Sequence, residues 1–199
     1  MTYKSPIEGV TSCIKYLISN YRFNNLIDVG CGYAPYKDLF NNVCYTGIDL
    51  IENDGDNFIK QNFNQYDFKD QEYDCVFTSH CIEHQPNIEF FLRKIKSIIK
   101  NNGVLCILWP PPKENVVGGH VNMFNPGMLL YNLTRIGFDC SRVRCIHSGY
   151  TYGVVGYVSI VNEVDLIYDS GDIELLSHLF PFNAKHAFHG VRDVDLINL

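Results

Sequence analysis

Short apolar runs alternate with amphipathic segments along most of this chain of 199 residues. The runs are rich in β-branched and aromatic residues and end at turn-forming residues, which is typical of buried strands. The pattern predicts seven strands, at residues 26–29, 44–48, 58–59, 74–78, 104–108, 138–146 and 154–161. Because strands alternate with helices, we predict an α/β fold with a mostly parallel seven-stranded sheet, helices on both faces and an antiparallel C-terminal hairpin strand.

Capping residues mark where the predicted helices begin and end. Ser5 as a cap and Pro6 at the first helical position indicate a first helix that continues to residue 20. A second helix is expected to end at Gly103, which suits a left-handed cap. Helical spacing also predicts a helix over 125–136, and a short helix is expected at 36–40.

Length and composition are those of a globular protein. We predict one domain over residues 1–199, with a sizeable core. The segment 170–199 lacks clear periodicity and is a candidate tail or lid on the substrate side, where His186 and His189 would lie. The net charge of −6 and the absence of a dense Lys/Arg cluster argue against a nucleic-acid substrate.

The eight cysteines form no CxxC pair, and several fall inside predicted strands. They are therefore expected to be small buried hydrophobic residues in a reducing compartment, rather than disulfides or a zinc site. No secretory signal and no apolar run of about 18 residues is apparent in the sequence. We expect a cytoplasmic protein without membrane insertion.

A glycine-rich turn follows the first predicted strand, with Gly30 and Gly32, and Asp49 ends the second strand. Glycines at such a turn let a cofactor approach the backbone, and an acid after the second strand accepts hydrogen bonds from ribose hydroxyls. A dinucleotide fingerprint would have a third glycine where this chain has Pro35, and no phosphate loop occurs. The pattern favours a cofactor with adenosine but no phosphate, of which S-adenosylmethionine is the common one. The alternative is an ordinary turn whose glycines have no ligand.

Six motifs, in order, resemble the class I S-adenosylmethionine-dependent methyltransferases of the group often called type 11. They are LIDVGCG at 26–32, YTGID at 45–49, FKDQEYDCVF at 68–77, CIEH at 81–84, IIKNNG at 98–103 and RIGF at 135–138. The resemblance implies a Rossmann-like fold, methyl transfer as the activity and S-adenosylmethionine as the cofactor, with S-adenosylhomocysteine as its product. Ala34 and Pro35 depart from the small residues that are usual after the second glycine.

The resemblance also implies roles for individual residues. The methionine end of the cofactor would lie against the glycine turn, and Asp49 would bind the ribose. Asn62 stands where many members have an aspartate that contacts adenine, and an amide oxygen can accept the same hydrogen bond. The complete predicted set of cofactor-contacting residues is Asp28, Gly30, Cys31, Gly32, Asp49, Leu50, Asn62, Phe63, Ser79 and His80.

Two histidines are predicted to be catalytic. A neutral hydroxyl or amine acceptor must lose a proton, and histidine suits that task. His80 ends the fourth strand and His120 lies in the loop after the fifth, so both are expected at the reaction crevice. The alternatives are a cofactor contact for His80 and a capping or packing role for His120. Tyr150 and Tyr152 are further candidates to line an acceptor pocket.

Metal binding is a separate question. His80, Glu83 and His84 offer ligand types that suit a divalent cation. A structural role for Glu83 and His84 at the start of a helix is favoured, so we predict no metal site. Whether the three residues bind a metal is not decided by the sequence.

The favoured function is transfer of a methyl group to an oxygen or nitrogen atom of a small molecule, for which a sugar or glycan precursor is one option. A nucleic-acid methyltransferase and a non-catalytic module that binds the cofactor are the alternatives. The sequence does not determine the acceptor, the pathway or the oligomeric state.

Overall fold

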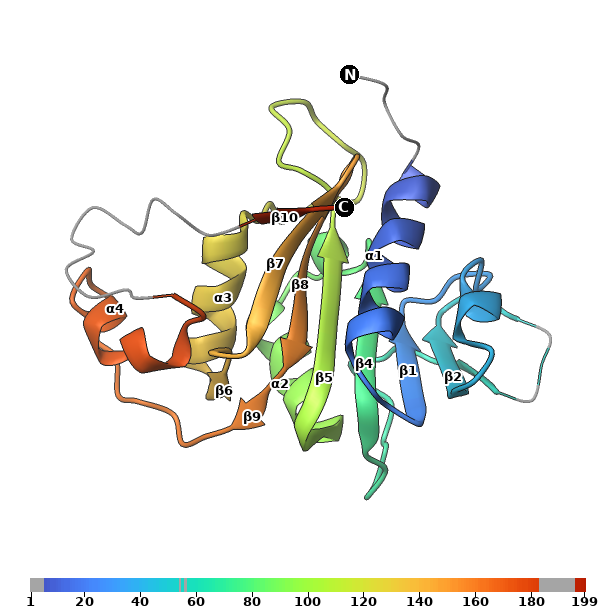
Figure 1. Cartoon of the computed structure of the whole chain (residues 1–199), viewed down its shortest axis with the longest axis horizontal. Helices are drawn as coiled ribbons and strands as arrows, with labels where there is room; N and C mark the ends of the chain where they lie inside the picture. The colour runs from blue at the N-terminus through green and yellow to red at the C-terminus, as the bar shows by residue number, and fades with distance from the viewer. Residues whose placement is uncertain (1–5, 54, 56, 183–195) are drawn as a thin grey trace.

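The Rossmann-like α/β fold predicted from the sequence is confirmed in the computed structural model, which describes residues 6–53, 55, 57–182 and 196–199. One sheet has the strand order β10-β7-β8-β5-β4-β1-β2-β3 (Figure 1). From one edge to the other, its strands are β10 (Leu196–Asn198), β7 (Val143–Ser148), β8 (Thr151–Tyr157), β5 (Ile99–Trp109), β4 (Tyr73–Ser79), β1 (Asn25–Val29), β2 (Cys44–Asp49) and β3 (Phe58–Lys60).

This sheet has eight strands rather than the predicted seven, because the chain end returns as β10 and pairs in parallel with β7. The antiparallel strand predicted near the C-terminus is β8, which lies between β5 and β7. All other neighbours pair in parallel, including β1 with both β2 and β4. Strand order reverses at β1 and β4, and such a reversal opens a crevice at the carboxyl ends of the strands.

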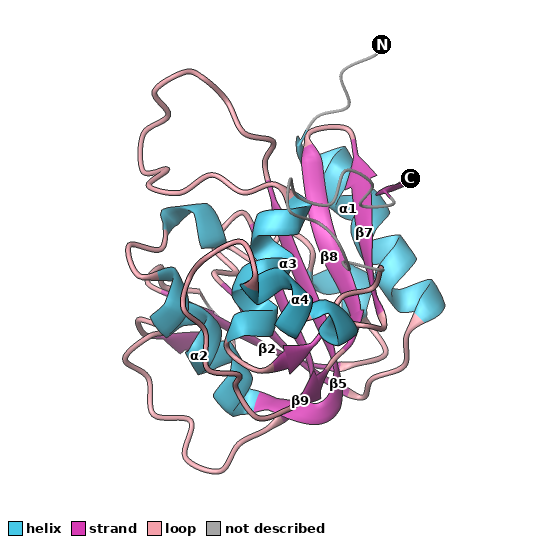
Figure 2. Cartoon of the chain, turned by 90° about the vertical axis from the view of Figure 1, so that its left-hand side faces the viewer, coloured by secondary structure: helices cyan, strands magenta, loops and turns pink. Residues whose placement is uncertain are grey.

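Helices cover both faces of the sheet, as predicted (Figure 2). Helix α1 (Pro6–Asn20) and the 3-10 turn η1 (Lys37–Phe40) share a core with one face. Helices α2 (Ile88–Ile98), α3 (Pro126–Arg135) and α4 (Asp172–Leu175), with the 3-10 turn η3 (Ser177–Leu179), pack on the other face. Side chains of β5 alternate between the two cores, which is the period-two pattern of a strand buried on both sides.

Two of the predicted strands have wrong boundaries. The run 138–146 is not one strand: Asp139 Oδ1 accepts a hydrogen bond from the Ser141 N–H, and the chain turns there. The result is a short β6 (Phe138–Asp139), which pairs with β9 (Ser159–Ile160) in a separate two-stranded sheet. The run 154–161 is likewise divided between β8 and β9.

Gly103 does not cap α2 either. The helix ends at Ile98, β5 begins at once, and Asn102 takes the left-handed conformation at φ 63°. Gly103 lies inside β5, where an added Cβ would be 2.7 Å from the Lys100 carbonyl oxygen. The glycine therefore permits a close backbone approach. The helix expected at 36–40 is reduced to the single turn η1.

Other expectations concern the cysteines and the chain ends. All eight cysteines lie within the described residues and are free, and Cys44 is the exposed one. Burial raises the pKa of the Cys31 thiol to about 12, so this thiol stays protonated.

Within the described residues, no helix combines the length and the apolar character needed to cross a membrane. Ser5, His186 and His189 lie outside the described residues.

Candidate active site

The glycine turn after β1 is held against β2 by backbone and side-chain hydrogen bonds. Gly30 and Gly32 have φ values of +75° and +54°, a region that favours glycine. The Gly30 N–H donates to the Ile48 carbonyl at 2.9 Å, and the Gly32 N–H donates to Asp49 Oδ2 at 2.8 Å. An added Cβ at Gly30 would lie 2.6 Å from Cys81 Sγ, so this glycine also lets β1 approach the segment after β4.

An open cleft of about 460 Å³ lies at the carboxyl ends of β1, β2 and β4, and we call it the cofactor cleft. It is lined by Val29, Gly30, Ile48, Asp49, Leu50, Gln61, Asn62, Phe63, Asn64, His80, Cys81, His84, Gln85 and Pro86. The structure thus brings together most of the predicted cofactor-contacting residues, although they come from four separate segments of the chain.

Four predicted contacts do not line this cleft: Asp28, Cys31, Gly32 and Ser79. Asp28 is buried beneath the glycine turn, and its Oδ2 accepts a 2.6 Å hydrogen bond from the Tyr45 hydroxyl. Burial raises the pKa of the Asp28 carboxyl to about 7. In this structure Asp28 is a buried residue of β1 bonded to β2 rather than an exposed carboxylate.

Asp49 is placed to bind a ligand in the cofactor cleft. Its Oδ1 accepts from the Ile51 N–H at 3.0 Å and its Oδ2 from the Gly32 N–H. A carboxylate has about four acceptor positions, so roughly two stay available for hydroxyl donors. The two backbone bonds fix the orientation of this side chain.

Two residues of the cofactor cleft, Asn64 and Gln85, form a pair that the sequence did not predict. Asn64 Nδ2 donates to Gln85 Oε1 at 3.0 Å, while Asn64 Oδ1 is buried and accepts no hydrogen bond among the described residues. A buried acceptor without a donor is costly, which points to a ligand N–H at this position. Phe63 is mostly part of the core, where it contacts Phe91 edge-on.

His80 follows β4 in a strained conformation. Its φ is +52°, which is uncommon outside glycine and is concentrated at functional sites. The backbone N–H of His80 donates to the Leu108 carbonyl at 3.0 Å, which holds the residue against the end of β5. Its Nε2 is buried without a hydrogen-bond partner among the described residues, and its Nδ1 lies 3.5 Å from Glu83 Oε1.

A second cavity of about 380 Å³ is formed by the loop 110–124, which projects beyond the end of β5 (Figure 1). We call it the loop cavity. Its walls combine proline, valine, Met123 and Phe124 with polar groups that include Glu83 and His120. Trp109 Nε1 donates to the Phe124 carbonyl at 2.9 Å, which joins the two ends of the loop.

The tyrosines predicted for the acceptor pocket lie next to this loop. Tyr150 occupies the turn between β7 and β8, where its ring faces Lys113 Nζ at 4.6 Å. Tyr152 is part of β8 and stacks on Trp109. Neither tyrosine lines the loop cavity itself.

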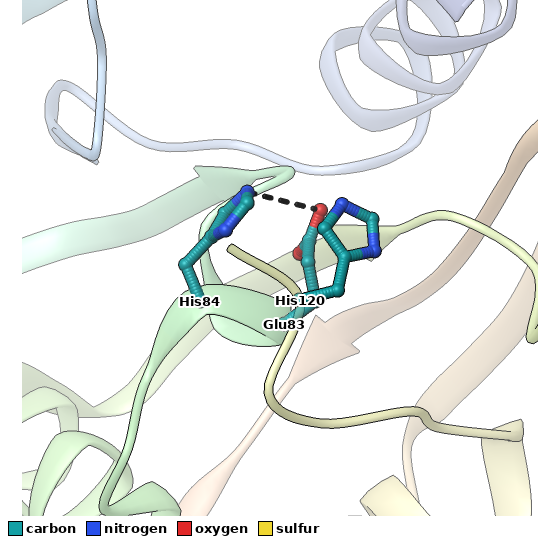
Figure 3. Close-up of side chains that lie close together, drawn as sticks. All are labelled: Glu83, His84 and His120. Atoms are coloured by element: carbon teal, nitrogen blue, oxygen red, sulfur yellow. Dashed lines mark ion pairs between the residues drawn. The ribbon is translucent and has the colours of Figure 1, made fainter. Parts of the chain in front are cut away.

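The two hollows meet at the 3-10 turn η2 (Ile82–His84), because Glu83 lines the loop cavity and His84 lines the cofactor cleft. Glu83, His84 and His120 lie together at this junction (Figure 3). Backbone bonds from Val121 and Asn122 to the Glu83 carbonyl, at 2.9 and 3.1 Å, hold the loop in place. No sequence spacing predicted this grouping of His120 with Glu83 and His84.

Comparison with known proteins agrees with this architecture. The model of a family described as a methyltransferase domain matches residues 10–115. A search of curated proteins finds no match. Among solved structures, a SAM-dependent methyltransferase from Archaeoglobus fulgidus is 17% identical, with a TM-score of 0.65 over 77% of this chain and 94% of that chain. Magnesium protoporphyrin IX methyltransferase from Synechocystis PCC 6803, solved with bound SAM, is 16% identical, with a TM-score of 0.55 over 74% of this chain and 77% of that chain.

The chain therefore belongs to the methyltransferase domain family. It is a class I methyltransferase, an enzyme whose methyl donor is S-adenosylmethionine (SAM). The resemblance noted in the sequence is thereby confirmed.

Proposed function

We propose that the chain binds S-adenosylmethionine in the cofactor cleft and transfers its methyl group to an oxygen or nitrogen atom of a small molecule held in the loop cavity. The observation that carries this proposal is the junction of the two hollows at η2. A donor in one hollow and an acceptor in the other would meet there, and positioning is the main task in a displacement with an activated donor.

The residues of the cofactor cleft fit an adenosine without phosphates. Asp49 would accept hydrogen bonds from the ribose hydroxyls. Asn62 and the unsatisfied Oδ1 of Asn64 offer acceptors for the adenine amino group. Gly30 would leave the backbone open to the ligand, while the buried Asp28 is bonded to Tyr45 of the neighbouring strand β2. The bound cofactor supplies a methyl group on a cationic sulfur.

His80 is proposed to take the proton that the acceptor loses. Its Nε2 is buried at the cofactor cleft with no partner among the described residues, so a ligand hydroxyl or amine would find a free acceptor there. His120 is proposed to contact the acceptor from the loop cavity. The C-terminal segment approaches the same edge, because Leu199 N–H donates to the His147 carbonyl at the end of β7. The lid expected at 170–199 stays a prediction, because residues 183–195 lie outside the described part of the chain.

A small acceptor is favoured over a nucleic acid because of charge. Lys113 is the single lysine or arginine among the residues that line either hollow in the described part of the chain. A groove for nucleic acid needs several phosphate-neutralising cations. A sugar or glycan precursor is one option for this small acceptor.

A screen with methyl-labelled donor tests this function. The purified chain is incubated with pools of metabolites, sugar nucleotides, RNA and DNA, and the label is followed by mass spectrometry. We expect incorporation in a small-molecule pool. Label in nucleic acid would overturn the choice of acceptor. Tight binding of S-adenosylhomocysteine without transfer to any pool would favour the non-catalytic module.

A further inference from the structure

Glu83 is a buried carboxylate that lacks the hydrogen bonds such groups normally have. The residue is 2% exposed, and neither of its side-chain oxygens accepts a hydrogen bond within the described part of the chain. Two ring nitrogens lie near it, His80 Nδ1 and His84 Nε2, at 3.5 and 3.9 Å from Glu83 Oε1. Burial of an ionised carboxylate is very unfavourable unless a positive charge or several donors compensate it.

His84 presents its Nε2 atom to that carboxylate. Its Nδ1 lies 2.8 Å from the Gly119 carbonyl oxygen, which can only accept a hydrogen bond, so Nδ1 carries the proton. In neutral imidazole Nε2 is then an acceptor, and it faces Glu83 Oε1 (dashed line in Figure 3). Metal-binding histidines typically donate their other N–H to a carbonyl in this way.

His120 completes a set of three ligands from a distant part of the chain. One ligand atom from each of Glu83, His84 and His120 lies within 4.8 Å of the others, and the two rings are nearly perpendicular (Figure 3). Gly119 allows this approach: its φ is +79°, and an added Cβ would lie 3.0 Å from His84 Nδ1. The loop is thus shaped to bring His120 beside η2.

We propose that Glu83, His84 and His120 bind a divalent transition-metal cation at the junction of the two hollows. Two imidazoles and one carboxylate are a ligand set for Zn²⁺ and similar ions that leaves at least one coordination position open. Bonds of about 2.0–2.2 Å would place neighbouring ligand atoms about 3.5 Å apart, so small side-chain rotations would complete the site.

A cation held here would lie between the two hollows, because Glu83 and His120 line one and His84 lines the other. Provided that the proposed function holds, this position would bind an oxygen of the acceptor and orient it toward the methyl donor. A hydroxyl on a divalent cation also loses its proton more readily. The site therefore favours a hydroxyl over an amine as the group that is methylated.

Metal binding can be measured without any activity assay. The chain is freed of metal with a chelator, titrated with Co²⁺, and followed by visible absorption and by equilibrium dialysis with Zn²⁺. We expect about one equivalent to bind, with affinity weakened about 10-fold or more in His120→Ala, a change in a loop residue. His178→Ala, at an exposed residue of η3, is the matched control and should bind as the unchanged chain does.

Binding of S-adenosylhomocysteine by calorimetry separates the possible failures. If His120→Ala binds this ligand normally but loses Co²⁺, the cation site is supported. Absence of Co²⁺ and Zn²⁺ binding in the unchanged chain, or equal affinity in His120→Ala, would overturn the cation site whatever the cofactor result. Absence of S-adenosylhomocysteine binding in a chain that binds Co²⁺ would instead overturn the proposed function alone.

Discussion

The cofactor cleft and the loop cavity lie next to each other but are built in different ways. The first is formed by strand ends and the turns directly after them, so its polar groups are placed by the hydrogen bonds of the sheet. The second depends on one long loop, 110–124, which is held by a few bonds to η2 and by Trp109. The comparison suggests that the fold fixes the cofactor cleft, which we call the donor side. The loop cavity, which we call the acceptor side, can change with the loop.

The strongest test of this division is His80→Ala, at the boundary between the two regions. If His80 takes the acceptor's proton, turnover should fall about 100-fold or more while affinity for S-adenosylhomocysteine changes little. Turnover is measured with the acceptor found in the screen, and His178→Ala is the control. Unchanged turnover would remove the proposed role of His80.

Gly30→Ala tests whether the donor side is fixed by the fold. The left-handed backbone and the contact with Cys81 should together lower the free energy of unfolding by about 2–4 kcal/mol. Urea denaturation measures the loss. Gly118→Ala is the control, because an added Cβ there meets no atom within 4 Å and its backbone is unstrained. Equal stability of the two variants would contradict this view of the turn.

Asp49→Ala should weaken S-adenosylhomocysteine binding about 10- to 100-fold, because charge-assisted hydrogen bonds to the ribose are lost. Calorimetry gives the dissociation constant, and the exposed Asp70→Ala serves as control. Asp49→Asn should lose less, since its amide oxygen can still accept a bond from Gly32. An unchanged constant in Asp49→Ala would show that the ribose binds elsewhere.

The smallest expected effect concerns Asp28, which supports the donor side from within the core. Its folded pKa of about 7 exceeds the ordinary value of 3.8, so between these values the folded state holds the extra proton. This contribution to stability is present at low pH and is lost as pH rises through 7. Asp28→Asn should remove a decline on the order of 2 kcal/mol between pH 5 and pH 8.

Urea denaturation of the unchanged chain and of Asp28→Asn at both pH values measures that decline as a difference, so other titrating groups cancel. Parallel pH dependence in the two proteins would mean that Asp28 is not the group responsible.

The donor side could largely be predicted from the sequence because its signals are contiguous. Gly30 and Asn62 follow strands, Asp49 ends one, and parallel strands bring their carboxyl ends to one edge. Asn64 and Gln85 were missed because their role depends on a side-chain pair that forms only in the folded chain.

The acceptor side was much less predictable. His84 and His120 are brought together by the docking of a loop with no periodic pattern, so the sequence could not indicate that they meet. The same limit explains the misread run 138–146, where a local Asp139 turn interrupts an apolar segment. Hydrophobic periodicity predicts elements, whereas such turns and loop contacts depend on individual polar groups.

A crystal structure of the chain with S-adenosylhomocysteine tests the central claim most directly. We expect the adenosine in the cofactor cleft, the ribose hydroxyls on Asp49 and the sulfur directed toward His80 and η2. A cofactor bound elsewhere, or a cleft that stays closed by side chains at saturating ligand, would contradict the account.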